Sequence, residues 1–142
     1  MNARITLIDG VAFNGEASSG HSVVMDGAPD PDNPAWSGQN RGARPMELLL
    51  LGLGGCTAYD VVTILRKGRH TVDDCQVEIE ATRAETPPKV FTRIHIIYRV
   101  KGQGLPLKAV ERAVKLSEEK YCSASIMLGK TAEMTHEVVL VD

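Results

Sequence analysis

The chain has 142 residues, a formal net charge of −2 and a pI of about 6.1. A chain of this length is typical of one domain, so we expect residues 1–142 to form a single domain. Because the sequence carries no basic field, we expect neither nucleic acid nor an anionic membrane surface as a partner. The N-terminal stretch alternates like a strand and lacks the continuous apolar core of a signal peptide, which favours a cytoplasmic location.

Three short strands are predicted at the start of the chain. Residues 4–9 and 11–16 alternate around Asp9-Gly10, a strong signal for a tight hairpin, and residues 20–26 follow as a third strand. The next stretch, G-A-P-D-P-D-N-P-A-W-S-G-Q-N-R-G, is rich in turn residues and predicts a loop. A loop of this length is either a functional lid or a disordered connection. Its Trp36 is either a lid anchor or an ordinary exposed aromatic residue.

The stretch from Pro45 to Gly68 predicts a long buried helix. It opens with Pro and, two residues later, Glu, and it closes with Arg-Lys before the final Gly, which are typical start and stop signals. The run of leucines that follows its start leaves no polar stripe before Asp60, so we expect the helix to be buried around its whole circumference. Asp60, Tyr59 and several glycines interrupt the apolar run, which argues against a transmembrane segment.

Glycines and a cysteine stand in the middle of this helix. Gly costs about 1 kcal/mol relative to Ala in a helix interior, so the group of Gly52, Gly54 and Gly55 requires a reason. One reason is the close packing of another helix against a patch without side chains. The other is access of a substrate or a partner thiol to Cys56. A buried Cys is more often a small hydrophobic residue than a working thiol, and this stretch alone leaves both interpretations open.

The second half of the chain predicts two strands, an amphipathic helix, a short helix and a last strand. In order, these elements cover residues 75–82, 90–101, 106–122, 124–130 and 133–141. The order βββ-α-ββ-α-β predicts an α+β domain in which an antiparallel sheet packs on two main helices. The buried side of the amphipathic helix is expected to carry Leu107, Val110, Val114 and Tyr121.

A helix that is apolar on every side is hard to cover in so small a domain. One amphipathic helix and one sheet shield about two of its faces. A symmetric dimer, in which the partner's helix covers the remaining faces, is the economical solution. We therefore expect a homodimer with residues 48–65 at its interface.

The three cysteines have different settings. Their number and spacing fit neither a paired disulfide framework nor a zinc pattern, so we expect no metal and no cofactor. Cys75 alternates with core residues of a strand and is expected to be structural. Cys122 precedes a helix start, where free backbone N–H groups favour a thiolate. A thiolate at Cys56, among leucines, requires a cation nearby, and Arg41, Arg44 and Lys120 are the candidates.

Two motifs resemble the OsmC/Ohr family of thiol-dependent hydroperoxide reductases. The helix reads P-M-E-L-L-L-L-G-L-G-G-C-T-A, and the second cysteine stands in E-E-K-Y-C-S. The stretches G-H-S-V-V-M-D, I-L-R-K-G-R and L-S-E-E-K-Y-C-S are similar to the YhfA-like branch of that family. The resemblance covers essentially the whole chain.

The resemblance implies a fold and a chemistry. It implies an OsmC-like fold, an intertwined homodimer in which two sheets wrap two central helices. It also implies that Cys56 is the thiolate that attacks the peroxide and that Cys122 is the resolving thiol. The substrate would be a small organic hydroperoxide, and a dithiol reductant of the dihydrolipoyl type would reduce the resulting disulfide.

The sequence departs from the family's well-studied peroxidases at three places. They carry an Arg in the first hairpin region, where this chain reads N-G-E-A-S-S-G-H. They place Glu directly after the Pro that opens the helix, where this chain has Met46. Its acid is Glu47, about 180° around a straight helix from Cys56. Ser123 replaces the family's Pro after the second cysteine. These departures predict slower hydroperoxide reduction.

The sequence therefore predicts a cytoplasmic OsmC-like thiol protein that reduces organic hydroperoxides through a Cys56/Cys122 dithiol–disulfide cycle in oxidative stress defence. One alternative is a binding protein without peroxidase activity, which holds a small apolar or thiol ligand beside Cys56. Another is a redox switch that keeps the cysteine pair without turnover. The residues expected to stabilise the thiolate or line the pocket are Arg41, Arg44, Met46, Glu47, Gly55 and Tyr59.

Overall fold

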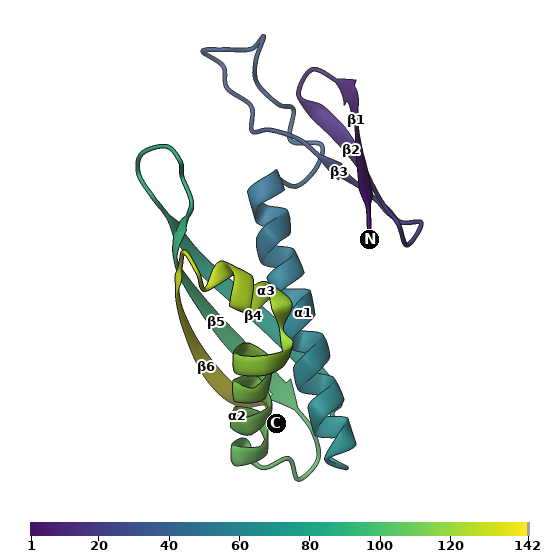
Figure 1. The fold of residues 1–142 in the computed structure, drawn as a ribbon, viewed down its shortest axis with the longest axis vertical. Coiled ribbons are helices and arrows are strands. Elements are labelled where there is room, and N and C mark those ends of the chain that lie inside the picture. The colour runs from purple at the N-terminus through teal and green to yellow at the C-terminus, as the bar shows by residue number, and fades with distance from the viewer. Residues whose placement is uncertain (142) are drawn as a thin grey trace. The chain divides into compact units, whose positions relative to one another are not determined.

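The structure, a computed structural model, describes residues 1–141 (Figure 1). Its contacts divide the chain into a first unit, Met1–Leu49, and a second unit that begins at Leu50. Strands dominate the first unit, and the second combines strands and helices. The α+β class predicted from the sequence is confirmed, and the expected single antiparallel sheet is replaced by two separate three-stranded sheets.

The first unit is an antiparallel meander with little cover of its own. Its strands are β1 (Ala3–Asp9), β2 (Ala12–Ala17) and β3 (Ser22–Met25), in the sheet order β1-β2-β3. Gly10 has φ +51°, as the predicted tight hairpin between β1 and β2 requires. Every residue of β1 is exposed, and its apolar side chains Ile5, Leu7 and Ile8 are at least half exposed. This sheet therefore presents apolar surface that its own unit does not bury.

The long loop after β3 is folded around one buried carboxylate. Asp26, only 2% exposed, accepts hydrogen bonds from the backbone N–H groups of Gly27, Gln39 and Arg41. A Cβ atom added at Gly38 would lie 2.1 Å from the carbonyl oxygen of Gly27, so the two loop arms touch through their backbones. Of the two alternatives left by the sequence, a functional lid or a disordered connection, the second is wrong, because the loop is ordered. Trp36, in the middle of the loop, is 80% exposed.

The second unit contains most of the long helix and the second sheet. Helix α1 (Pro45–Lys67) begins in the first unit and leads to β4 (Asp74–Arg83) and β5 (Phe91–Lys101), which pair antiparallel. The chain then forms α2 (Leu107–Leu116), the π-helical turn η1 (Ser117–Tyr121) and α3 (Ser123–Leu128) before β6 (Glu133–Val141).

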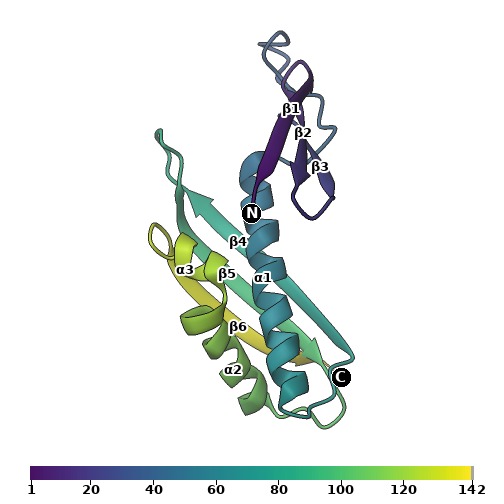
Figure 2. The ribbon, with the colours of Figure 1, turned by 45° about the vertical axis from the view of Figure 1, so that its right-hand side comes forward.

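Strand β6 pairs parallel to β5, which corrects the antiparallel sheet predicted from the sequence. The reason is the long connection through α2, η1 and α3, because a crossover of this kind returns the chain in the same direction as the strand it left. Figure 2 shows α1 and α2 on the same side of the β4-β5-β6 sheet.

The core of the second unit lies between that sheet and the two helices. On β5 the predicted alternation is confirmed, since Ile94, Ile96, Tyr98 and Val100 are all fully buried. On α1 the buried residues recur every four positions, which defines one inward face: Leu53, Thr57, Val61 and Leu65. At Gly54 the helix lies close to β4, since a Cβ built there would be 3.3 Å from the Ile79 side chain. The absence of a side chain at Gly54 permits this approach.

Burial of α1 is confined to that one face in a single chain. In the single chain Leu51 is 65% exposed and Tyr59 is 74% exposed, so the all-round burial predicted from the leucine run requires the expected partner chain and stays a prediction. By length and composition α1 could cross a membrane, but the core helices of soluble proteins meet the same criterion.

Helix α2 changes geometry before it reaches the second cysteine. Val110, Ala113 and Val114 are buried as an amphipathic helix requires, but Leu107 is 42% exposed and Tyr121 is 52% exposed, against the prediction. The π-helical turn explains Tyr121, because its wider turn shifts the later side chains out of the α-helical register. The Cys122 N–H closes this turn on the carbonyl of Ser117 at 2.7 Å.

Candidate functional site

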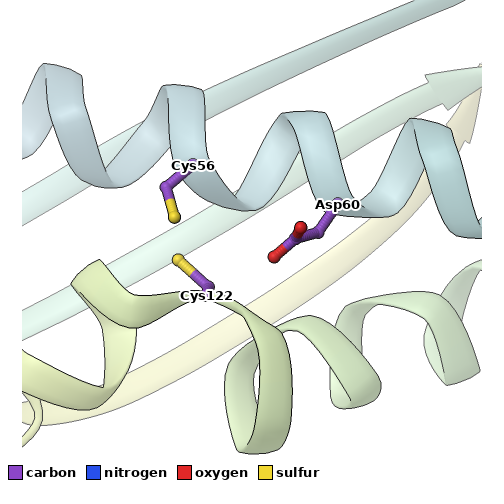
Figure 3. A group of neighbouring side chains, drawn as sticks. All are labelled: Cys56, Asp60 and Cys122. Atoms are coloured by element: carbon purple, nitrogen blue, oxygen red, sulfur yellow. The ribbon is translucent and has the colours of Figure 1, made fainter.

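Two thiols face each other across the interior of the second unit. Cys56 projects from the middle of α1, and Cys122 stands between η1 and α3 (Figure 3). Their sulfur atoms and one carboxylate oxygen of Asp60 all lie within 4.8 Å of one another. Cys56 is partly exposed, whereas Cys122 is fully buried, and both are free thiols. The structure thus brings together the two cysteines that the sequence singled out.

The environment of Cys122 favours the thiol over the thiolate. Burial raises the pKa of Cys122, and its contact with Cys56 raises it further. The N–H of Ser125 donates to the Cys122 sulfur at 3.4 Å and opposes this effect. The helix start therefore lowers the pKa of Cys122 as predicted, but the effect of burial, which raises this pKa, is larger. Cys122 must therefore give up a proton for its sulfur to attack another atom.

A chain of buried hydroxyl groups connects α1, β5 and η1 behind the thiols. The Thr57 hydroxyl lies 2.7 Å from the Tyr98 hydroxyl and 3.0 Å from that of Ser117. Ser117 in turn donates to Oδ2 of Asp60 at 3.1 Å. Thr57, Tyr98 and Ser117 are each fully buried, so these bonds satisfy groups that would otherwise be costly to bury.

The same chain reaches a second carboxylate at its other end. The Tyr98 hydroxyl donates to Oε1 of Glu118 at 3.4 Å, and His136 Nδ1 lies 2.8 Å from Oε2 of that residue. Burial raises the pKa of Glu118, although His136 opposes the shift. Burial likewise raises the pKa of Tyr98, so its hydroxyl stays protonated as a donor. A continuous line of polar groups therefore runs from Asp60 to partly exposed His136.

Cys56, Asp60 and Cys122 are also the donors in the described part of the chain that could hold a metal ion. Two thiols and a carboxylate are ligands that Zn²⁺ accepts, and a closed structural zinc site requires a fourth. The described residues supply three donors at this place, so the group does not form a complete structural zinc site.

The two arginines predicted to stabilise the thiolate have partners in the first unit. Arg41 forms ion pairs with Asp9 and Asp26. Arg44 bonds to the side chain of Asn40. Burial opposes ionisation of Asp26, but three backbone N–H groups and the Arg41 side chain lower the pKa of Asp26 to about 2. A role of either arginine at Cys56 stays a prediction.

Glu47 serves the start of α1. Its Oε2 accepts a hydrogen bond from the Arg44 backbone N–H at 2.9 Å, which is one half of a capping box. This contact agrees with its position on the helix, about 180° from Cys56. Met46, next to it, is half-buried. Their predicted roles in the pocket stay predictions.

Gly55 and Tyr59 lie on the open side of α1. No atom lies within 4 Å of a Cβ built at Gly55, so this glycine leaves free space beside Cys56. Tyr59 and Asp60 line a hollow of about 350 Å³ together with Lys67 and Tyr121. The sequence reasoning did not identify Asp60 as part of the site. Its spacing of four residues from Cys56 on a helix was the signal that could have found it.

Cys75 lies outside this group. It pairs with Val100 in the β4–β5 ladder, and burial raises the pKa of Cys75. Both facts agree with the structural role predicted from its alternation with Val77 and Ile79. Cys75 therefore provides a matched control for experiments on the other two thiols.

The chain is similar in sequence to a known protein family. The model of the "OsmC-like protein" family matches residues 38–137, more than two thirds of the chain. The chain belongs to the OsmC family. It is 43% identical over 141 residues to the protein YhfA of Escherichia coli K12, covering 99% of this chain and 98% of YhfA. The resemblance to the YhfA-like branch is thereby confirmed.

Solved structures of similar proteins agree on the fold. A hypothetical protein from Aquifex aeolicus is 32% identical with a TM-score of 0.80, covering 99% of this chain and 97% of that one. An OsmC-like protein from Mycoplasma pneumoniae is 14% identical with a TM-score of 0.82, covering 99% and 96%. The organic hydroperoxide resistance protein OhrB of Bacillus subtilis is 16% identical with a TM-score of 0.61, covering 98% of each chain. The last two show similarity of fold alone.

Proposed function

We propose that this OsmC-family chain is a thiol-dependent reductase of organic hydroperoxides. The observation that carries the proposal is the pair of free thiols, Cys56 and Cys122, which face each other across the interior of the second unit. The thiolate sulfur of Cys56 attacks the terminal peroxide oxygen, and the O–O bond breaks. The alkoxide that leaves takes up the proton that Cys56 had released and departs as an alcohol. The resulting sulfenic acid at Cys56 is attacked by Cys122, which forms a disulfide and releases water.

The different burial of the two thiols supports this division of roles. Cys56 is partly exposed beside a glycine with open space above it, so a small hydroperoxide can reach its sulfur. Cys122 is fully buried and its pKa is raised by that burial, so it is the poorer first nucleophile. It is well placed to attack once Cys56 has been oxidised.

The names of distant relatives are consistent with the substrate class. The solved structures of similar fold include proteins described as organic hydroperoxide resistance proteins from Bacillus subtilis and Elizabethkingia anophelis. We propose oxidative stress defence in the cytoplasm as the setting, with a dihydrolipoyl-type dithiol as the reductant. That dithiol attacks the Cys56–Cys122 disulfide and leaves as its own cyclic disulfide, which restores both thiols.

We also propose that the working form is a homodimer. Apolar side chains are exposed on α1, where Leu49 is 47% and Leu51 is 65% exposed, and along β1 of the first unit. A three-stranded sheet requires an apolar cover for independent stability, and a second copy of the chain would supply it for both elements.

A steady-state assay tests the activity directly. Wild-type protein is incubated with cumene hydroperoxide and dihydrolipoamide, beside Cys56→Ser, Cys122→Ser and the control Cys75→Ser. We expect wild type and Cys75→Ser to consume the hydroperoxide over many turnovers and Cys56→Ser to consume none above background. Without the family's hairpin arginine, the wild-type rate should be lower than that of relatives which carry it. A wild-type rate equal to that of Cys56→Ser would reject the enzyme and favour a binding protein.

A further inference from the structure

Asp60 is the third member of the thiol group and has no role in the cycle described so far. It follows Cys56 by four residues on α1, so the two side chains share one face of the helix. In Figure 3 its carboxylate points toward the space between the sulfurs of Cys56 and Cys122. Its nearest oxygen lies within 4.8 Å of both sulfurs, a gap that one water or a small rotation of the side chain closes.

The position of this carboxylate is fixed by the buried hydroxyl groups behind it. Ser117 donates its only hydroxyl proton to Oδ2 of Asp60 at 3.1 Å. Because that proton is used, the Ser117 oxygen accepts from Thr57 at 3.0 Å, and the Thr57 oxygen lies 2.7 Å from the Tyr98 hydroxyl. Ser117 therefore holds Oδ2 of Asp60, while Oδ1 accepts no hydrogen bond from any residue in the range 1–141 and can exchange a proton.

No basic side chain competes for that oxygen. Within the described residues 1–141, no Lys, Arg or His forms an ion pair with Asp60. A carboxylate without a cation beside two thiols does not favour a thiolate by charge, since like charges repel. It can instead accept a proton from a thiol at the moment that the sulfur attacks, which is the role of a general base.

The disulfide-forming step requires such a group. Cys122 is fully buried and is a thiol before the step, and the oxygen that leaves Cys56 must depart as water. One proton is therefore released at Cys122 while one proton is needed at the leaving oxygen. A single group near both sulfurs can make these two transfers without help from bulk solvent.

We propose that Asp60 is the general acid–base residue of the disulfide-forming step, an inference that rests on the proposed function. Asp60 takes the proton from Cys122 as that sulfur attacks the sulfur of the Cys56 sulfenic acid. The S–S bond forms and the S–O bond breaks. The leaving hydroxide takes the proton from Asp60 and departs as water, so the carboxylate is restored. The hollow of about 350 Å³ that Asp60 lines gives this water a path.

A transient-kinetic experiment isolates the step from peroxide chemistry. In a Cys75→Ser background, Cys56 is made to react with Ellman's reagent, which forms a mixed disulfide and releases a first thionitrobenzoate anion. Attack by Cys122 on that mixed disulfide releases a second anion and forms the protein disulfide. Cys122→Ser should show the first phase alone, which assigns the second phase to Cys122.

The variant Asp60→Asn keeps an oxygen that can accept from Ser117 but cannot take up a proton. We expect its first phase to be no slower than that of the parent, because the substitution removes a like charge beside Cys56. Its second phase should be slower by at least about 100-fold at neutral pH. The defect should shrink as the pH rises, because a Cys122 thiolate then forms without a base. Asp60→Glu should recover part of the rate, and Glu119→Gln, at an exposed carboxylate of η1, should change neither phase.

Other ionisable groups around Asp60 must be considered in the pH profile. Tyr59 and Lys67 of α1 and Tyr121 of η1 line the same hollow. Tyr98 and Glu118 lie along the hydroxyl chain on the opposite side. A pH-dependent change in the rate of the second phase is assigned to Asp60 only if it disappears in Asp60→Asn.

The outcomes distinguish the two proposals. A second phase of equal rate and equal pH dependence in Asp60→Asn and the parent would overturn the role of Asp60, whatever the peroxide assay shows. If Asp60→Asn slows the second phase as expected while hydroperoxide leaves Cys56 unoxidised, the proton transfer stands as part of disulfide formation and the substrate assignment fails. A slower first phase in Asp60→Asn would show a structural defect instead and would also overturn the inference.

Discussion

The pKa values of two carboxylates in this chain, Asp26 and Glu118, are shifted in opposite directions by their surroundings. Asp26 is buried, but backbone N–H groups and Arg41 stabilise its charge and lower its pKa to about 2. Glu118 is partly buried, and there the loss of water dominates and raises its pKa. The number of hydrogen-bond donors that reach each carboxylate decides which effect is larger. Asp26 therefore supports structure as an anion, whereas Glu118 can change its protonation nearer to neutral pH.

The shift at Asp26 predicts how the first unit responds to acid. Its folded-state pKa of about 2 is below the ordinary value of 3.8, so its contribution to stability is present above pH 3.8 and is lost as the pH falls through 2. Asp26→Asn should lower the melting temperature at pH 5, and the difference from wild type should narrow as the pH falls from 5 toward 2. Thermal unfolding followed by circular dichroism measures this difference.

The control for this prediction lies in the same loop. Asp32 is exposed, so Asp32→Asn should leave the melting temperature close to that of wild type throughout this pH range. A difference between wild type and Asp26→Asn that stays constant from pH 5 to pH 2 would show that the charge of Asp26 does not support the loop.

At the scale of the element, α1 presents three different surfaces. One face carries Leu53, Thr57 and Val61 into the core of the second unit, and another carries Cys56 and Asp60 to the site. The remaining leucines gain nothing from exposure to water. Burying a Leu side chain stabilises by about 1.5–3 kcal/mol, so we assign this third surface to the proposed dimer.

A charge on that surface should dissociate the proposed dimer. Leu51 is 65% exposed in the single chain, so Leu51→Glu should leave the fold of each chain intact. A symmetric dimer carries the change twice, at about 1.5–3 kcal/mol for each copy, which raises the dissociation constant by at least about 100-fold. Sedimentation velocity at micromolar concentration should show a dimer for wild type and monomers for Leu51→Glu.

The matched control is the same substitution on another helix. Leu107 at the start of α2 is 42% exposed, and Leu107→Glu should remain dimeric. A monomeric wild type would contradict the assignment of the exposed surface of α1 to the interface. So would a finding that both variants, Leu51→Glu and Leu107→Glu, are monomers.

The elements differ in how far the sequence predicted them. Strand β6 was predicted at its observed bounds and α1 within one residue, because alternation and end signals act locally. The parallel pairing of β6 was not predicted, since strand direction depends on the crossover and not on the strand itself. The π-helical turn was also missed, and with it the exposure of Tyr121, because no local signal distinguishes an extra residue in a turn.

The site was predicted to a similar extent. The approach of Cys56 and Cys122 followed from the family resemblance, and the structure places them together. Asp60 and the hydroxyl chain behind it were missed, because Thr57, Ser117 and Tyr98 come from three elements whose packing no local pattern reveals. In a sequence alone, a buried Thr or Ser cannot be distinguished from one at the surface.

At the scale of the whole molecule, the two units differ in how well they can stand alone. The second unit has a core between a sheet and two helices. The first unit has one meander with an exposed β1 and an apolar hollow of about 440 Å³ bordered by Ile5, Val11 and Phe13. A small sheet of this kind is marginal without further cover. We therefore expect the first unit to depend on the partner chain more strongly than the second.

The central claim is that a hydroperoxide oxidises Cys56 and that Cys122 resolves the product. The most direct test treats the reduced protein with one equivalent of cumene hydroperoxide, blocks the remaining thiols, and maps disulfides by mass spectrometry of unreduced peptides. The account predicts a link between Cys56 and Cys122, with Cys75 recovered as a blocked thiol. A link from Cys75 to either of the other cysteines, or a Cys56 that remains a free thiol, would contradict it.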